Sequence, residues 1–305
     1  MKHVEPIARQ ENKWGGTELI KLAPQLVQYQ GSKRKLAPQI IPYMPESIDR
    51  LVEPFSGMAA ITVAVATKGM AKRYWINDVN EPLVQLLKTA VEKPDYLYEC
   101  YKAVWDAQFV YPGGHIEHYY YIRELFNTGE KTPANTLYLL ARCVKGAVRY
   151  SSEGNFNQSP DKRRHGTRPE RVKDNAMTLH ELLCGKTLFT SLDFRELIGE
   201  LSASDFIYMD PPYQGVSNTR DHRYYSGVAK SELIDYLEKL NDLGCDYILS
   251  YDGKLGVKAY GDELPSKLGC KKIMLDAGLS AQSTLLGKKE TTIEALYLSR
   301  GLFCD

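Results

Sequence analysis

The chain has 305 residues, of which 43% are hydrophobic and 25% are charged, and its formal net charge is +1. This composition is typical of a globular protein, and no apolar stretch approaches the ~20 residues of a membrane span, so we expect no membrane partner and a cytoplasmic location. Six cysteines without CxxC spacing and six histidines without ligand spacing argue against a disulfide framework and a metal site.

The N-terminal part of the chain alternates strands and helices. After a basic turn at 29–35, we expect a strand at 50–52, a helix at 59–67, a strand at 73–76 and a further helix capped by Asn80. This order of elements is typical of a parallel sheet with right-handed crossovers.

The middle of the chain has a different pattern. Residues 94–146 are helical in pattern and rich in tyrosine, residues 149–157 predict a hairpin that turns near Gly154, and a helix is expected at 169–184. Between residues 142 and 173, nine Lys or Arg stand against three acids. Such a cluster is expected of a contact with a phosphate backbone, although a solvated loop would show it too.

The sheet pattern returns in the last third of the chain. A helix is expected at 231–243, and strands are expected at 187–191, 206–209, 247–250, 272–275 and 292–298. The predicted fold class is therefore α/β, with one doubly wound sheet that carries an inserted, mainly helical domain with a hairpin.

The most informative stretch is Phe-Ile-Tyr-Met-Asp-Pro-Pro-Tyr at 206–213. Proline cannot donate to a ladder, so Pro211 and Pro212 end the strand and leave Asp210 and Tyr213 at its carboxyl edge, where open α/β sheets bind ligands. Carboxylate and carbonyl acceptors beside a flat ring suit a planar molecule with an exocyclic amino group, such as a nucleobase. The alternative is a plain exit from strand to loop with a surface tyrosine.

Acids also follow the first two expected strands. Glu53 precedes Gly57 on a strand-to-helix turn, where a carboxylate can accept hydrogen bonds from a ligand, and Asp78 ends the next strand, where ribose hydroxyls bind in this topology. One glycine stands where a dinucleotide fingerprint needs three, so the pair suits a nucleoside without a pyrophosphate. The alternatives are a helix N-terminal acid for Glu53 and a part in the Asn80 cap for Asp78.

These motifs resemble, in this order and over most of residues 25–300, those of S-adenosylmethionine-dependent DNA adenine N6-methyltransferases of the Dam type and the α motif order. Tyr29-Gln-Gly-Ser-Lys33 resembles the family's N-terminal Trp-Ala-Gly-Gly-Lys element, Leu51-Val-Glu-Pro-Phe-Ser-Gly57 its cofactor loop, Ile76-Asn-Asp-Val-Asn80 its ribose-binding segment, Asp210-Pro-Pro-Tyr213 its catalytic motif, and Arg149-Tyr150 with Gly154-Asn-Phe-Asn157 its DNA-reading hairpin. The chain departs from the family at Tyr29, where tryptophan is usual, and at Met58-Ala59, where a small residue and a glycine are usual.

The resemblance implies a Rossmann-like methyltransferase fold. Residues 25–93 and 186–305 would form the catalytic domain that binds S-adenosylmethionine, residues 94–185 the target-recognition domain, and residues 1–24 an N-terminal extension. The implied reaction is methyl transfer from S-adenosylmethionine to N6 of a flipped-out adenine in double-stranded DNA, within a restriction-modification system. The Asp210 carboxylate and the Pro211 carbonyl would accept the two N–H bonds of the amine.

We expect four groups of site residues. The catalytic residues expected are Asp210, Pro211, Pro212 and Tyr213. The cofactor-binding residues expected are Tyr29, Gly31, Lys33, Glu53, Phe55, Gly57, Asp78, Asp193, Phe194 and Asp210, although Asp193 could instead cap a helix. The DNA-binding residues expected are Lys33, Arg149, Asn155, Asn157, Lys162, Arg163 and Arg164, with Arg149 on a base edge and the triplet 162–164 on phosphates. The target base would lie against Tyr213 and against Tyr224 or Tyr225.

Double-stranded DNA is the expected partner. We expect a monomer or weak dimer, and a cognate restriction endonuclease that acts on the same site without a stable complex. The alternatives are methylation of adenine in RNA or of cytosine N4 in DNA, a catalytically silent nucleic-acid-binding module, and a nicotinamide-dependent dehydrogenase, which the missing glycines disfavour.

Overall fold

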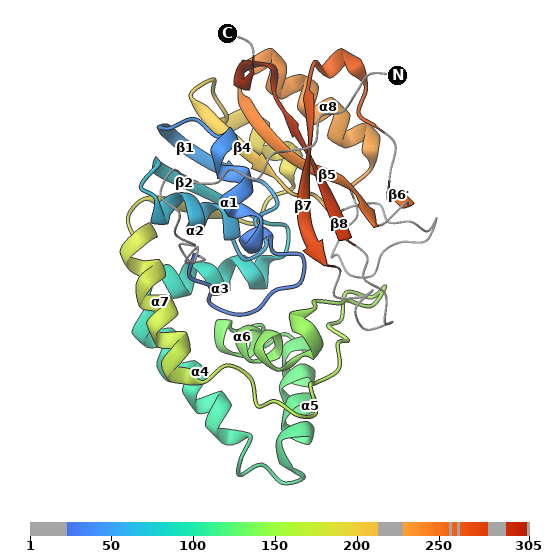
Figure 1. The fold of residues 1–305 in the computed structure, drawn as a ribbon. Helices are drawn as coiled ribbons and strands as arrows, with labels where there is room; N and C mark the ends of the chain where they lie inside the picture. Colours follow the sequence, from blue (N-terminus) through green and yellow to red (C-terminus); the bar gives the residue numbers. More distant parts are fainter. Residues whose placement is uncertain (1–22, 213–227, 256–257, 261–262, 280–290, 304–305) are drawn as a thin grey trace, which may run out of the picture.

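The computed structural model describes residues 23–212, 228–255, 258–260, 263–279 and 291–303. Its centre is an eight-stranded sheet with the strand order β3-β2-β1-β4-β5-β8-β7, and β6 pairs with β5 (Figure 1). The strands are β1 (Ile48–Glu53), β2 (Ala71–Asn77), β3 (Thr187–Thr190), β4 (Asp205–Met209), β5 (Asp246–Leu255), β6 (Lys258–Tyr260), β7 (Lys271–Leu279) and β8 (Thr291–Leu298).

Helices cover the sheet and extend below it in Figure 1. The α-helices are α1 (Ala37–Ile40), α2 (Ala60–Thr67), α3 (Glu81–Glu92), α4 (Pro94–Ala107), α5 (Gly114–Asn127), α6 (Pro133–Arg142), α7 (Pro169–Leu183) and α8 (Lys230–Leu243). Short 3-10 helices are η1 (Lys33–Lys35), η2 (Ile41–Tyr43), η3 (Val144–Gly146), η4 (Phe194–Glu200), η5 (Ser266–Leu268) and η6 (Arg300–Leu302). Among the described residues, no helix has the length and apolar character needed to cross a membrane.

Both faces of the sheet are buried. In β4, Phe206 and Tyr208 pack into a core shared with α2 and α3, whereas Ile207 and Met209 pack into a second core shared with η4 and α8. Because side chains alternate between the two faces of a strand, a strand covered on both sides must be apolar throughout. This arrangement confirms the predicted α/β, doubly wound class.

The strands at the C-terminal edge of the sheet pair in antiparallel fashion. The strands from β3 to β5 pair in parallel, as the alternating pattern predicts, but β8 is antiparallel to both β5 and β7. Parallel neighbours need a crossover of a dozen or more residues, and the segment 280–290 between β7 and β8 is shorter than that. The short connection therefore accounts for the antiparallel pairing of β7 with β8, and it does not bear on the pairing of β8 with β5.

The stretch 94–146 consists of three helices and a 3-10 turn. Helices α4, α5 and α6 lie together at the end of the molecule away from β1, β2 and β4 (Figure 1). The predicted hairpin is present, because Tyr150 and Phe156 form an antiparallel bridge and Gly154 turns the chain with a φ of +81°. The limits 94–185 for a separate recognition domain stay a prediction.

Asn80 occupies the N-cap position of α3, but its side chain makes no capping bond. Its Oδ1 atom instead accepts a 3.3 Å hydrogen bond from the Tyr150 hydroxyl. The backbone N–H of Asn80 donates to Asp78 Oδ1 over 2.9 Å. The expectation of an Asn80 side-chain cap is therefore wrong, because the hairpin takes that side chain and Asp78 binds the backbone in its place.

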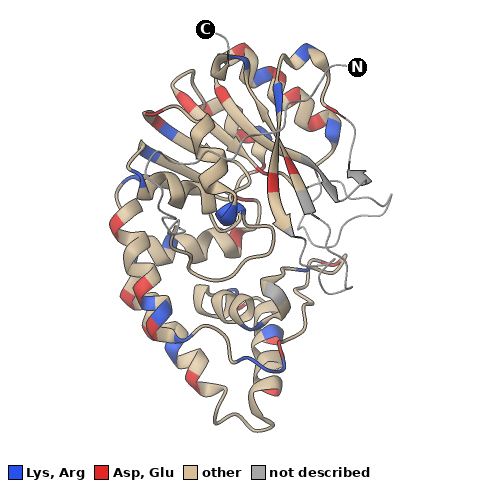
Figure 2. Ribbon diagram, in the orientation of Figure 1, with Lys and Arg blue, Asp and Glu red and all other residues tan. Residues whose placement is uncertain are grey.

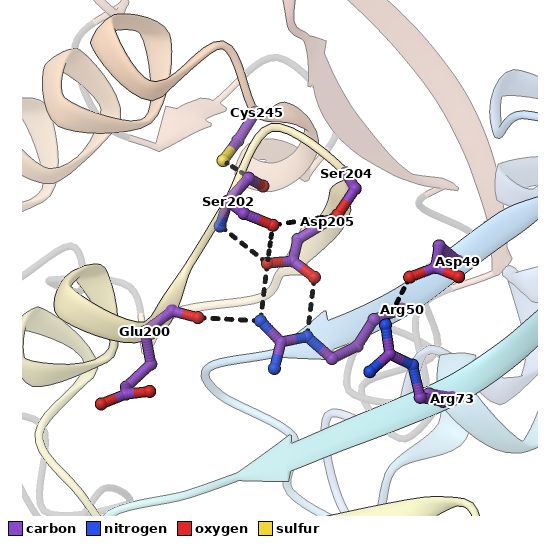
Figure 3. Close-up of polar contacts among 8 residues, drawn as sticks. All are labelled: Asp49, Arg50, Arg73, Glu200, Ser202, Ser204, Asp205 and Cys245. Atoms are coloured by element: carbon purple, nitrogen blue, oxygen red, sulfur yellow. Dashed lines mark hydrogen bonds and ion pairs between the residues drawn. The ribbon is translucent and has the colours of Figure 1, made fainter.

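An ion pair between the partly exposed Arg50 and the buried Asp205 joins β1 to β4 (Figure 3). Arg50 donates to Asp205 through Nε over 2.6 Å and through Nη2 over 2.7 Å, and the Ser202 backbone N–H donates to Asp205 Oδ2 over 2.8 Å. Arg50 and Asp205 are also register partners in the parallel ladder. The bidentate geometry fixes the relative register of the two strands, whose carboxyl ends carry Glu53 and Asp210.

Candidate active site

A cavity of about 510 Å³ opens at the carboxyl ends of β1, β2 and β4. This is the edge at which doubly wound sheets bind ligands, and the volume is that of an ordinary small-molecule site. Its lining includes every described residue that we expect to bind the cofactor or to act in catalysis: Tyr29, Gly31, Lys33, Glu53, Phe55, Gly57, Asp78, Asp193, Phe194, Asp210, Pro211 and Pro212. The structure therefore brings these residues together, and binding at them stays a prediction.

A hydrogen bond to Asp78 holds the loop that follows β1. The Gly57 backbone N–H donates to Asp78 Oδ2 over 2.8 Å, while Oδ1 is held by Asn80. Burial raises the pKa of Asp78 above its ordinary value, against the two backbone bonds that lower it. Asp78 thus has a structural role in the loop, and it also lines the cavity.

Ala59 begins α2 in a left-handed conformation, with φ 51° and ψ 41°. Among the described residues it is the one non-glycine residue with a positive φ. It stands where the resemblance would place a glycine, and a residue with a Cβ disfavours this conformation. Gly57 also has a positive φ, and a Cβ there would lie 3.2 Å from the Tyr29 ring.

Two phenylalanines form an aromatic wall of the cavity. The rings of Phe55 and Phe194 lie 5.0 Å apart between centroids, tilted by 41°. Asp193 precedes Phe194 and caps η4, because its side chain accepts from the Arg195 N–H and pairs with the Arg195 guanidinium at 2.7 Å. The Arg195 bonds lower the pKa of Asp193. The alternative role of Asp193 as a cap is therefore present, and it still borders the cavity.

Charged side chains of the cavity lining gather around Lys33 and Asp210. Lys33 Nζ lies 3.0 Å from Asp210 Oδ1 and 3.7 Å from Glu294 Oε2. Glu53 is buried and accepts a 3.1 Å hydrogen bond from the Thr62 backbone N–H. Burial, with a smaller contribution from the charge of Asp210, raises the pKa of Glu53 to about 7. One lysine against three carboxyl groups makes this part of the cavity suitable for a cationic ligand.

The lining also contains residues that the sequence did not single out, among them Glu294 and Tyr208. Glu294 lies in β8, and Tyr208 lies in β4, two residues before Asp210. A signal for Glu294 existed, since it is the only charged residue in Thr291–Leu298. Tyr208 carried no such signal, because a tyrosine in a buried strand is ordinary.

Three expected residues lie outside the described part of the chain: Tyr213, Tyr224 and Tyr225. The extension 1–24 lies outside it as well, except for residues 23 and 24. Among the residues that the structure describes, no group of three or more His, Cys, Asp or Glu side chains could hold a metal ion.

The residues expected to bind DNA, apart from Lys33, are not in the cavity lining but are all exposed: Arg149, Asn155, Asn157, Lys162, Arg163 and Arg164. The loop between α6 and α7, which carries the basic triplet, passes α5 and is partly blue in Figure 2. On α7, by contrast, acidic and basic residues alternate (Figure 2). The excess of positive charge is therefore concentrated in the loop.

Side chains of α5 and α6 hold the backbone of this hairpin and loop. Asn127 accepts from the Phe156 N–H over 2.8 Å and donates to the Phe156 carbonyl over 3.0 Å. Tyr119 donates to the Gln158 carbonyl over 2.9 Å, and the buried Arg142 donates to the Asp161 carbonyl over 3.1 Å. These hydrogen bonds fix the backbone of the hairpin and the loop to α5 and α6. The exposed basic side chains are therefore carried by a well-anchored backbone.

Comparison with known proteins identifies a family to which the sequence is similar. Residues 29–269 match the model of the D12 class N6 adenine-specific DNA methyltransferases. The chain is 28% identical to the DNA N-6-adenine-methyltransferase of Escherichia phage P1 over 76% of this chain and 30% of that protein, and 27% identical to the modification methylase StsI of Streptococcus sanguinis over 73% of this chain and 34% of that protein. It thus spans about a third of the length of these two relatives.

A further relative is matched over nearly its whole length. The type II methyltransferase M1.LlaDCHI of Lactococcus lactis subsp. cremoris is 25% identical over 88% of this chain and 93% of that protein. The family model covers well over half of the chain, including the residues of the cavity from Tyr29 to Pro212. The chain belongs to the D12 class N6 adenine-specific DNA methyltransferase family.

Proposed function

We propose that this chain transfers a methyl group from S-adenosylmethionine to N6 of adenine in double-stranded DNA. The observation that carries the proposal is the position of Asp210 and Pro211, which border a nucleoside-sized cavity at the end of β4 in a chain of this family. A methyl donor is required by the family's reaction. S-adenosylmethionine suits the cavity because its sulfonium and ammonium charges match the surplus of carboxyl groups, and its adenosine suits the aromatic wall of Phe55 and Phe194.

The residues of the chain act by accepting hydrogen bonds. Adenine N6 is a weak nucleophile because its lone pair is delocalised into the ring. The Asp210 carboxylate and the Pro211 carbonyl accept its two N–H bonds, which localises the lone pair and orients it. Both acceptors stabilise the amine more strongly as it becomes cationic, so their effect is larger in the transition state than in the ground state. The sulfonium would supply an activated methyl group and leave as a thioether, and the methylated amine would release one N–H proton to solvent. No covalent bond to the protein is needed.

The target adenine must leave the duplex before it can reach Asp210. That step costs a few kcal/mol, which stacking and edge hydrogen bonds in the site offset. In this proposal Arg149 contacts a base edge, and the basic triplet at 162–164 contacts phosphates. The exposure of these side chains supports their access to DNA. A role in a restriction-modification system is supported by the names of the relatives, and a monomer or weak dimer acting in the cytoplasm remains our expectation.

The experiment is a methylation map with matched variants. DNA from a host that expresses the chain should carry N6-methyladenine at one recurrent sequence. Asp210→Ala should abolish that mark while calorimetry still detects S-adenosylmethionine binding, and the exposed Asp235→Ala on α8 should leave the mark unchanged. Full activity in Asp210→Ala would refute the role of Asp210. Methyl transfer to structured RNA in preference to duplex DNA would refute the substrate.

A further inference from the structure

One ammonium in the cavity stands between two carboxylates from different parts of the chain. The distances from Lys33 are 3.0 Å to Asp210 and 3.7 Å to Glu294, and the three side chains are 8%, 20% and 18% exposed. In the proposed reaction, Asp210 must accept an N–H bond from the adenine amine. In the structure, the nearer carboxylate to Lys33 is that same Asp210.

An ammonium on Asp210 opposes this task. It takes up part of the negative charge that the N–H bond would use, and it repels an amine that becomes cationic as the methyl group arrives. The Lys33 ammonium would also share the cavity with S-adenosylmethionine, whose sulfonium is positively charged as well. Lys33 should therefore leave Asp210 as the base enters.

Glu294 is positioned to receive the ammonium. Its residue pairs with Gly253 of β5 and with Leu275 of β7, so ladders hold its backbone on both sides. The distance from Lys33 to Glu294 is longer than that to Asp210 by only 0.7 Å (3.7 − 3.0). A partly buried carboxylate in a strand that is otherwise uncharged is costly unless a charged partner compensates it, and Lys33 is such a partner.

Glu53 does not serve the same purpose as well. It is buried and hydrogen-bonded to Thr62, and its raised pKa of about 7 leaves it partly protonated near neutral pH. With the Lys33 ammonium on Glu294, the Asp210 carboxylate faces the amine. Without Glu294, Asp210 would be shared between Lys33 and the substrate.

We infer that Glu294 is a positioning residue that takes the Lys33 ammonium from Asp210 when the target amine binds. The inference rests on the proposed function, because it concerns the same methyl transfer. It adds a residue from β8, which no motif of the sequence includes, and it gives Lys33 a role that depends on whether the site is occupied.

Single-turnover kinetics on a duplex with the mapped site test the inference. Glu294→Gln should lower the rate by about tenfold or more, because the ammonium stays on Asp210, while the affinity for S-adenosylmethionine changes by less than about threefold. Glu294→Asp keeps the carboxylate and should recover part of the rate. Lys33→Met/Glu294→Gln should be no slower than Lys33→Met, because the ammonium that Glu294 would take from Asp210 is absent from both variants. The exposed Glu263→Gln, which removes a partner of Lys272, serves as the control.

A second measurement does not depend on turnover. In the absence of S-adenosylmethionine, calorimetry measures the affinity of the protein for two duplexes. One duplex has adenine at the target position, and the other has purine, which lacks the amino group. The preference of the wild type for adenine over purine should fall by about threefold or more in Glu294→Gln, because Lys33 then competes with the amine for Asp210. A purely structural role of Glu294 would weaken both duplexes equally.

The outcomes separate the two proposals. A wild-type rate and an unchanged adenine preference in Glu294→Gln, or losses that multiply in the double variant, would overturn the inference and leave the proposed function intact. A wild-type chain that methylates no adenine would overturn both.

Discussion

The backbone N–H of Gly57 donates a 2.8 Å hydrogen bond to Asp78 Oδ2, and this bond ties the loop after β1 to the end of β2. The other oxygen of the same carboxylate accepts from Asn80. One side chain therefore shapes two walls of the cavity at once. Two neighbouring parallel strands end at one edge of the sheet, so residues 57 and 78 meet there although they are far apart in sequence.

The first prediction concerns this carboxylate. Asp78→Asn offers one acceptor oxygen in place of two, so either Gly57 or Asn80 loses its partner and the loop opens. The affinity for S-adenosylmethionine, measured by calorimetry, should fall by about tenfold or more. The exposed Asp106→Asn on α4 is the control and should bind as the wild type does. Wild-type affinity in Asp78→Asn would contradict the role of the loop.

Ala59 leads to a second prediction. Its left-handed conformation is costly for any residue with a Cβ, so Ala59→Gly should raise the free energy of unfolding by about 1 kcal/mol. Ala60→Gly, one residue further into α2, should lower it by about 0.5 kcal/mol, because a right-handed helical position gains nothing from glycine. Denaturant unfolding of both variants checks the opposite signs. Two losses of equal size would contradict the strain at residue 59.

The raised pKa of Glu53 predicts a pH dependence of stability. In the unfolded chain this carboxyl group ionises at its ordinary pKa of 4.5, whereas in the folded chain it holds its proton up to about pH 7. The contribution of the protonated group is fully present below pH 4.5 and is lost as the pH rises through 7. In Glu53→Gln this contribution is absent, so the difference in unfolding free energy between variant and wild type should change by up to about 3 kcal/mol between pH 5 and pH 8, in favour of the variant at the higher pH. Parallel curves in denaturant titrations of the ligand-free protein would contradict the shift.

The ion pair between β1 and β4 predicts a loss of stability. Arg50→Met leaves the Asp205 carboxylate, which is 2% exposed, without its bidentate partner, and unfolding should become easier by about 3 kcal/mol. Figure 3 also shows the matched control, since Arg73 and Asp49 pair nearby at the surface. Arg73→Met should have no measurable effect, because water replaces an exposed partner. The unfolding free energies of both variants are measured by thermal or denaturant unfolding. Equal losses in Arg50→Met and Arg73→Met would contradict the prediction that the burial of Asp205 makes its ion pair more important.

The last prediction distinguishes base recognition by Arg149 from sequence-independent phosphate contacts. Arg149→Ala should relax the preference at one base pair, with a loss of about 1–3 kcal/mol in discrimination. Replacing Lys162, Arg163 and Arg164 by Ala should weaken binding to all sequences alike and reduce the slope of log affinity against log salt by about 3. Binding to a panel of duplexes at several salt concentrations distinguishes the two effects. A sequence-independent effect from both changes would refute the division.

Local sequence patterns predicted most of the elements. Apolar runs that end in an acid or a proline located the ends of β1, β2 and β4, and the glycine after α2 located the end of that helix. The hairpin at 149–157 was readable because Gly154 marks its turn. Such features depend on neighbours within a few residues, so a single sequence carries them.

The sequence by itself determined the fold class and the acids that follow the strands, because strand periodicity, prolines and glycines act over short distances. Only the tertiary structure decided that β8 runs antiparallel, that Asn80 turns to Tyr150, and that Glu294 lies beside Lys33. Each of these depends on the packing of segments that are up to some 260 residues apart (294 − 33 = 261). Their meeting is set by the register of the whole sheet, and no local pattern encodes that register.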